Sequence, residues 1–497
     1  MPAQALTGFG YPIEKPGLQP GVRASATWSN NIGHRSSGGD SDVVLEASPY
    51  VTAESTAPRA SYRLFYQLRN FVRLSDGETN FFRHALNGQG SFALVDDRFG
   101  VDLTGFMGTI NASPMGAISA DPASSFANTA NVRYFSVSPW YRDVLGRLAT
   151  YQLRYRLAHS GGNSGFTTAK LDQTASAEVD GIPAAGSRWN WRWAGNMQRR
   201  EFSDNLTRDR QHSSFSVFYS IYPSLRVYGM VDYEYIEGLR NKDGDNDGYG
   251  PGAGFDWTPF QRTTVSGSVS KRFYGTVGNL GLSHTMHRAT MGLRYSRSVL
   301  TSADASLLLF NPAALTSGGF GQPNPVLSNL LSAGILLPPG TVLTQGLFTD
   351  AAVLDRRLTA FWGLRGARNA LTFTGYFSNR ESTTELQSQT QFTGIRGSAT
   401  FGGIFTGEVR ERGIVASYSH TLDGRSTADF TIDRRRIESA TAFFETQYTT
   451  FRVGYRTWIT SDLAAFAGAR RTLQTAEGRG TNYNENAIYG GVDLRFY

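Results

Sequence analysis

The sequence predicts an all-β fold, a transmembrane antiparallel up-and-down β-barrel of about 22 strands, with 20 as the alternative count. Three observations carry this prediction. Segments of about ten residues alternate apolar and polar side chains, and this is the length that a tilted strand needs to cross a bilayer. The connections between them alternate between short turns and long loops. The last alternating segment is placed to pair with the first, which a barrel requires for closure.

Composition agrees with many strands and excludes a helical membrane protein. Aromatic residues make up 13% of the 497 residues, and 55 residues are glycine, which is typical of strands, tight turns and interfacial aromatic girdles. The mean hydropathy is -0.31, and no apolar run is long enough for a transmembrane helix. Cysteine is absent, which excludes disulfides, thiolate metal sites and a thiol nucleophile.

The first 20 residues are expected to lie outside the barrel. Ala3-Gln-Ala5 has the small-x-small form of a signal-peptidase site, so residues 1–5 are interpreted as a signal-peptide remnant. The Gly- and Pro-rich segment 6–20 is interpreted as an extended periplasmic lead-in. The barrel is assigned to residues 21–497, in a Gram-negative outer membrane with both termini in the periplasm.

From residue 22 onwards, the clearest strands have one apolar and one polar face. Alternate positions are aromatic or aliphatic in Tyr62–Leu68, Tyr151–Leu157, Trp189–Trp193, Leu371–Phe377 and Phe451–Tyr455. The interleaved positions carry arginine, glutamine, asparagine, serine or threonine. In a barrel the apolar face meets lipid and the polar face lines the lumen. A soluble sandwich would instead turn its polar face outward.

The connections fall into two classes that take turns along the chain. Short ones such as 57–59, 95–98, 222–225 and 422–425 contain Pro, Gly, Asp or Ser, which suit tight turns. Long ones include 111–130, 381–408 and the insertion 300–353. Within that insertion, Pro325–Leu337 is expected to form a short apolar helix. This helix would constrict the lumen, meet a partner at the rim, or pack on its own loop.

The closing strand is expected near the end of the chain. Alternate residues from Ile488 to Phe496 are apolar or glycine, and the interleaved ones include Asp493 and Arg495. Its expected partner is the first strand, around residues 22–30. Barrel closure is assigned to three residues, Val492, Leu494 and Phe496. The alternative is an edge strand of a soluble β-domain.

Arginine dominates the basic residues. Four of the 48 basic residues are lysine, so 44 are arginine, a residue that binds carboxylate, phosphate and sulfate with a planar fork; codon usage is the alternative explanation. Eight arginines of inward parity are assigned to a substrate path through the lumen, namely Arg63, Arg154, Arg156, Arg192, Arg294, Arg365, Arg452 and Arg456. Acidic residues share this parity, at Asp232, Glu234, Asp429 and Asp433, so the alternative is a lumen of internal ion pairs. Since the arginines are scattered singly, no nucleic-acid partner is expected.

One acidic loop resembles the start of a calcium-binding loop. Asp243, Asp245 and Asp247 stand at alternate positions before a glycine and are candidate calcium ligands. The twelfth position is Gly254 instead of glutamate, so a solvated acidic turn is the alternative. The seven histidines lack metal-ligand spacing, and no G-x-S-x-G motif occurs. Neither a cofactor nor an enzymatic activity is predicted.

Two stretches carry a resemblance to a known family. Arg133-Tyr-Phe-Ser-Val-Ser-Pro-Trp140 and the segment Gly146–Arg156 resemble the outer-membrane β-barrels of PEP-CTERM/exosortase systems, a branch of the β-barrel porins. Residues 43–49, 271–275 and 355–358 agree, and the resemblance covers residues 20–497. It implies a place beside exopolysaccharide and protein-sorting genes. Tyr497, one residue beyond the apolar parity, departs from the usual signature of the last strand.

These observations lead to a porin-like conduit as the functional hypothesis. It would pass a polar, anionic solute or exopolysaccharide linked to an exosortase system across the outer membrane. The alternative is a structural sheath or anchor that binds an envelope or surface partner through its lumen or long loops. The expected partners are outer-membrane lipid and lipopolysaccharide, an anionic polysaccharide, and a periplasmic or surface protein.

Overall fold

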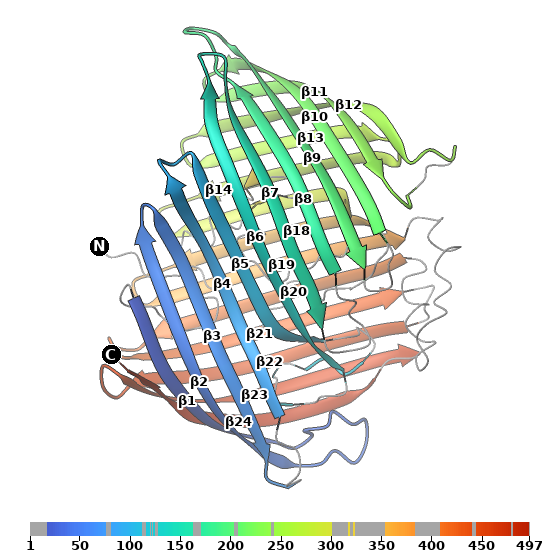
Figure 1. Ribbon diagram of the computed structural model, residues 1–497. Coiled ribbons are helices and arrows are strands. Elements are labelled where there is room, and N and C mark those ends of the chain that lie inside the picture. The colour runs from blue at the N-terminus through green and yellow to red at the C-terminus, as the bar shows by residue number, and fades with distance from the viewer. Residues whose placement is uncertain are drawn as a thin grey trace.

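The computed structural model describes residues 17–75, 81–111, 116–119, 121, 123–124, 128–162, 170–202, 207–239, 243–300, 317–318, 322–323, 353–382, 408–439, 444–478 and 481–496. In these residues, 22 antiparallel strands form one closed sheet, as the sequence predicts (Figure 1). No helix of the described part is long and apolar enough to cross a membrane.

Each strand of the barrel pairs with its neighbours in sequence. The strands are β1 (Gly17–Ser29), β2 (Asp42–Ala57), β3 (Ala60–Arg73), β4 (Phe81–Val95), β5 (Phe99–Asn111), β6 (Thr129–Leu145), β7 (Ala149–Gly162), β8 (Lys170–Gly181), β9 (Trp189–Phe202), β10 (Thr207–Tyr222), β11 (Leu225–Ile236), β12 (Asp247–Phe260), β13 (Thr263–Arg272), β14 (Gly275–Thr285), β15 (Ala289–Leu300), β18 (Val353–Arg365), β19 (Asn369–Ser382), β20 (Glu408–Thr421), β21 (Ser426–Ser439), β22 (Phe444–Trp458), β23 (Leu463–Gly478) and β24 (Tyr483–Arg495). The two-residue strands β16 (Ser317–Gly318) and β17 (Gln322–Pro323) form a separate pair.

The predicted closure is confirmed. Strand β24 pairs with β1, so that Leu494 lies opposite Val22 and Val492 opposite Ala24. The Phe496 amide extends this ladder by donating to the Pro20 carbonyl at 2.9 Å. Because β1 already pairs with β2 from Gly17 onwards, the barrel begins before the predicted boundary at residue 21.

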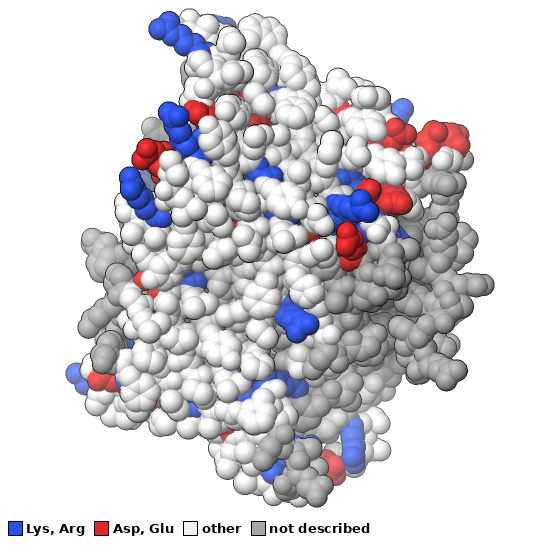
Figure 2. Space-filling model, viewed as in Figure 1, with Lys and Arg blue, Asp and Glu red and all other residues white. Residues whose placement is uncertain are grey.

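The two faces of the strands also follow the predicted parity. On β24, Val492 and Leu494 are 43% and 38% exposed, whereas Asp493 between them is 1% exposed. On β9, Trp189 and Trp191 point outward and Arg192 lies on the opposite face. Figure 2 shows broad uncharged areas on one side of the barrel, with charged side chains mainly towards its margins. Such an outer surface suits contact with lipid.

Short turns and both described chain ends lie at one end of the barrel, which we call the short-turn end (Figure 1). The opposite end is called the long-loop end. Strand β15 ends at Leu300 and β18 begins at Val353, so the long insertion has its predicted boundaries. The helix predicted over residues 325–337 lies outside the described residues.

The shortest strands of the described barrel are β13 and β14. These strands have 10 and 11 residues, and a tight turn at Phe273 and Tyr274 joins them at the long-loop end. Ile236 is the last residue of β11, and Leu239 follows that strand. Both pack with Val299 and Leu354, and this cluster contacts Phe273 and Tyr274 of the turn. This apolar cluster therefore covers the short hairpin.

Candidate functional site

All eight predicted lumen arginines lie at inward positions of their strands. Five of them contact a carboxylate of the same wall: Arg63–Glu54, Arg154–Asp102 and Arg192–Asp180 at 2.5 Å, Arg456–Asp493 at 3.0 Å and Arg156–Asp172 at 3.6 Å. The other three, Arg294, Arg365 and Arg452, stand on β15, β18 and β22. The alternative of internal ion pairs thus describes most of this set. The prediction that these arginines form a substrate path has no further observation behind it.

Further ion-pair networks line the same wall. The inward or outward position of each residue can be read from the sequence, but its ion-pair partner cannot. On β10–β13, Arg210 contacts Glu234 at 2.7 Å, and Arg272 bridges Asp232 and Glu234, both at 3.1 Å. On β19–β20, Arg380 contacts Glu411 at 3.3 Å. Register across the strands brings these residues together. An arginine that already binds a carboxylate is poorly placed to attract a passing anion.

A segment between β5 and β6 folds against the inner wall. Its described residues, 116–119, 121, 123, 124 and 128, are here called the strap. The strap contacts β23 and β24, although β1 to β4 lie between these strands and β5 in the sheet. Gln474 of β23 accepts from the Ile118 amide at 2.9 Å and donates to the Gly116 carbonyl at 3.0 Å. Tyr483 of β24 donates from its hydroxyl to the Ile118 carbonyl.

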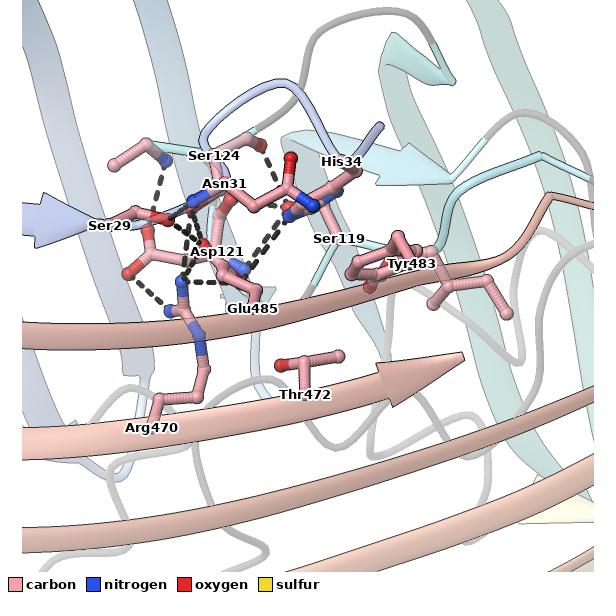
Figure 3. A network of polar contacts seen from close by, with 12 residues as sticks. Ser29, Asn31, His34, Ser119, Asp121, Ser124, Arg470, Thr472, Tyr483 and Glu485 are labelled. Atoms are coloured by element: carbon pink, nitrogen blue, oxygen red, sulfur yellow. Dashed lines mark hydrogen bonds and ion pairs between the residues drawn. The ribbon is translucent and has the colours of Figure 1, made fainter. Parts of the chain in front are cut away.

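The centre of this contact is a buried ion pair between β23 and β24 (Figure 3). Arg470 contacts Glu485 at 3.1 Å and Asp121 of the strap at 2.9 Å, and the side chains of Arg470 and Glu485 are both 0% exposed. Ser124 of the strap and Ser29 of β1 each donate to Glu485 at 2.8 Å. Buried charges persist when they are paired and hydrogen-bonded. This network therefore joins the strap to the seam where the barrel closes.

The connection between β1 and β2 reaches the same network through His34. The imidazole is buried, with its Nε2 3.3 Å from Glu485, and stacks on the Tyr483 ring at a centroid distance of 4.2 Å. His34 has a left-handed φ of 52°, which is uncommon for a residue other than glycine. Beside it, Ile32 packs with Ala123 of the strap and with Phe71.

Electrostatics keeps the strap carboxylate ionised. Burial alone would raise the pKa of Asp121, but Arg470 and then Arg69 act against burial, and the Ala123 amide also donates to it. The net effect holds the pKa of Asp121 well below its ordinary value. A charged Asp121 is therefore part of the folded strap at neutral pH.

The network fastens the strap to β23 and β24; we call it the buried lock. Arg470 pairs with Glu485 and Asp121, and Ser29 and Ser124 donate to Glu485, so these contacts hold the strap to the wall. The alternation of apolar and polar residues could have placed Arg470 and Glu485 inside the barrel, because each lies on a strand in which this alternation is regular. No comparable signal identifies Asp121 or Ser124, since a loop has no periodicity and their partners are hundreds of residues away in sequence.

The predicted calcium ligands do not form a metal site. Within the part of the chain that the structure describes, no three histidine or acidic side chains come together in a way that could hold a metal ion. Asp247 instead accepts a hydrogen bond from the Tyr233 hydroxyl at 3.2 Å. Since Asp247 begins β12, its backbone is extended and does not wrap around a cation. The solvated acidic turn is the better description.

Comparisons with known proteins support the barrel and its location. No family model matches the chain, and no curated protein matches it. Among solved structures, the FrpB iron transporter from Neisseria meningitidis is similar, with a TM-score of 0.50, 9% identity, and coverage of 97% of this chain and 82% of that one. The siderophore receptor PirA from Pseudomonas aeruginosa has a TM-score of 0.45 at 10% identity, covering 97% and 81%. A variant of the ferric enterobactin receptor PfeA from Pseudomonas aeruginosa, in complex with enterobactin, has 0.48 at 10%, covering 97% and 82%.

At such identities the likeness shows the fold, a large outer-membrane β-barrel. The porin-like conduit for an anionic solute or exopolysaccharide is therefore corrected. Barrels of 16 to 18 strands form water-filled porins, whereas 22-stranded transporters have a plugged lumen, and the structure that matches at a TM-score of 0.50 is an iron transporter. The physical error lay in reading inward arginines as free cations, because register pairs most of them with carboxylates.

Proposed function

We propose that this protein is an outer-membrane uptake receptor for iron held in a compact chelate of the siderophore class. The observation that carries the proposal is the closed wall of 22 strands, the size of barrel that serves gated transport instead of free diffusion. The inner wall supports it. Most of its described arginines are paired with carboxylates of the chain, so the wall does not hold an excess of mobile anions in the lumen. The proteins of similar fold, an iron transporter and siderophore receptors, suggest the ligand class.

The proposed orientation places the long-loop end outside the cell and the short-turn end in the periplasm. Long loops outside and short turns inside are the usual arrangement of bacterial barrels. A ligand would then enter at the end where the strap lies against the inner wall. The strap is held to the wall there by its contacts with Gln474, Tyr483 and Arg470.

Uptake of iron tests this function directly. The full chain is produced in a bacterial host that lacks its own siderophore receptors, and radioactive iron is supplied as ferric enterobactin or as a ferric hydroxamate. We expect saturable accumulation of iron with one of the two chelates, and quenching of tryptophan fluorescence when that chelate is added to the purified barrel. Liposomes containing the barrel should not swell in neutral sugars. Rapid swelling together with no saturable iron uptake or binding would overturn the proposal.

The resemblance to the exosortase-associated barrels stays a prediction, as does the absence of enzymatic activity. We infer from the resemblance only that the gene stands beside envelope genes. Inspection of its neighbours tests this: genes for iron reduction or chelate transport would favour uptake alone.

A further inference from the structure

The outer surface of β20 and β21 changes from apolar to basic towards the long-loop end. On β20 the outward residues run from Tyr418 and Ile414, both exposed, to Arg412 and Arg410. On β21 they run from Phe430 to Arg434 and Arg436. Charged groups are tolerated on the lipid face only near the membrane interface. The change therefore marks the level at which hydrocarbon gives way to polar headgroups.

Like charges face each other at this level. Arg412 lies directly opposite Arg436 in the ladder, and Arg434 lies opposite Ile414, one step further along. Side chains in directly opposite positions are about 5 Å apart at Cβ, and like charges there repel. The same arrangement recurs at Arg297 and Arg356, which are paired between β15 and β18.

Neighbouring carboxylates neutralise this cluster only in part, because Glu438 and Glu445 offset two of the three charges of Arg412, Arg434 and Arg436. Arg436 contacts Glu445 at 2.5 Å and Glu438 at 3.3 Å, and Glu445 also accepts from Gln447. Among the described residues, Arg412 and Arg434 have no carboxylate within ion-pair distance, and both side chains are exposed. The contrast with the inner wall is clear, since most arginines there have a carboxylate. An anion from outside the chain would complete the outer cluster.

We propose that Arg412 and Arg434, with Arg436 beside them, bind the phosphate groups of lipopolysaccharide in the outer leaflet. Guanidinium forks match phosphate oxygens bidentately and keep their charge when partly desolvated. The exposed apolar residues on the same strands, Ile414 and Phe430, would contact the acyl chains of the same lipid. This inference rests on the long-loop end facing outward and is independent of the ligand that the lumen carries.

Lipid binding by the purified full-length barrel tests the site. The double variant R412Q/R434Q is compared with the parent and with R199Q, which removes an outward arginine of β9 that lies 3.8 Å from its own carboxylate neighbour, Glu201. Each barrel is titrated in detergent with diphosphorylated lipid A, dephosphorylated lipid A and phosphatidylglycerol. Bound lipid is measured by native mass spectrometry. Folding of each variant is checked by the heat-dependent shift of its band in electrophoresis.

We expect the double variant to bind diphosphorylated lipid A roughly 30-fold more weakly than the parent, as the loss of two interfacial arginines implies. R199Q should bind like the parent. The parent alone provides a second test, because it should prefer the diphosphorylated lipid to both others. Equal binding of the three lipids by the parent, or equal binding of lipid A by a folded double variant, would overturn the proposal. Iron uptake by the double variant is a separate measurement, so failure of one proposal does not imply failure of the other.

Discussion

At the scale of single residues, the inner wall reflects the cost of burying an unpaired charge. Arg470 and Glu485 are fully enclosed, so each needs the other to offset the hydration that it loses. The exposed pair Arg226 and Asp256, at 2.7 Å, has the same chemistry in contact with water. The buried and the exposed arginine–carboxylate pair should therefore contribute very differently to stability.

Substitution of Arg470 measures this difference. Arg470→Gln leaves the buried Glu485 and the partly buried Asp121 without their cation and should lower the free energy of unfolding by about 3–5 kcal/mol. R470Q/E485Q should lose less than the sum of its two single variants, since neither charge is then left alone. Arg226→Gln, as the exposed control, should change stability by at most about 1 kcal/mol. Urea unfolding in detergent micelles gives all four values, and equal losses for Arg470→Gln and Arg226→Gln would contradict the assignment of the buried lock.

At the scale of elements, strands were predictable from the sequence and the strap was not. Alternation placed Val492 outside and Asp493 inside because a strand has a strict period of two. The same parity placed Arg154 and Arg192 correctly on the inner face. It could not pair them with Asp102 and Asp180, because a partner depends on the register between strands. The strap lies in a loop without any period, so its contact with β23 and β24 required the structure.

Acid should release the strap through Asp121. Its pKa is lower in the folded chain than in the unfolded one, so its contribution to stability is complete above the ordinary value of about 3.9 and is lost as the pH falls further. Hydrogen exchange of the strap amides, corrected for intrinsic rates, should stay constant from neutral pH to about pH 4 and accelerate below it. Asp121→Asn should remove this step. A loss of protection near pH 6.5 in the parent would instead indicate a histidine as the titrating group.

At the scale of the whole molecule, closure of the sheet decides whether the barrel exists in a membrane. Each of the 22 described barrel strands has two neighbours because β24 pairs with β1, so this sheet has no edge exposed to hydrocarbon. The sequence predicted this seam well, since both strands alternate clearly and lie at opposite ends of the barrel sequence. It predicted the strand number but not the state of the lumen, because the pairing of inward charges depends on the register between strands. That register is a property of the assembled sheet.

We expect barrel assembly to be most sensitive to substitution of the last apolar residue at the seam, Phe496. The Phe496 amide continues the β1 ladder and its side chain is exposed on the outer face, so Phe496→Asp would place a carboxylate beside lipid at the seam. We expect a strong loss of the folded, heat-modifiable band, because unpaired backbone groups at membrane depth each cost several kcal/mol if the end of β24 detaches. Ile459→Asp is the matched control, since Ile459 is an exposed apolar residue in the turn between β22 and β23 at the same end and should assemble nearly as the parent does. Normal assembly of Phe496→Asp would show that the seam tolerates a charge at this position, and that closure depends on the backbone ladder from Gly21 to Ser29 alone.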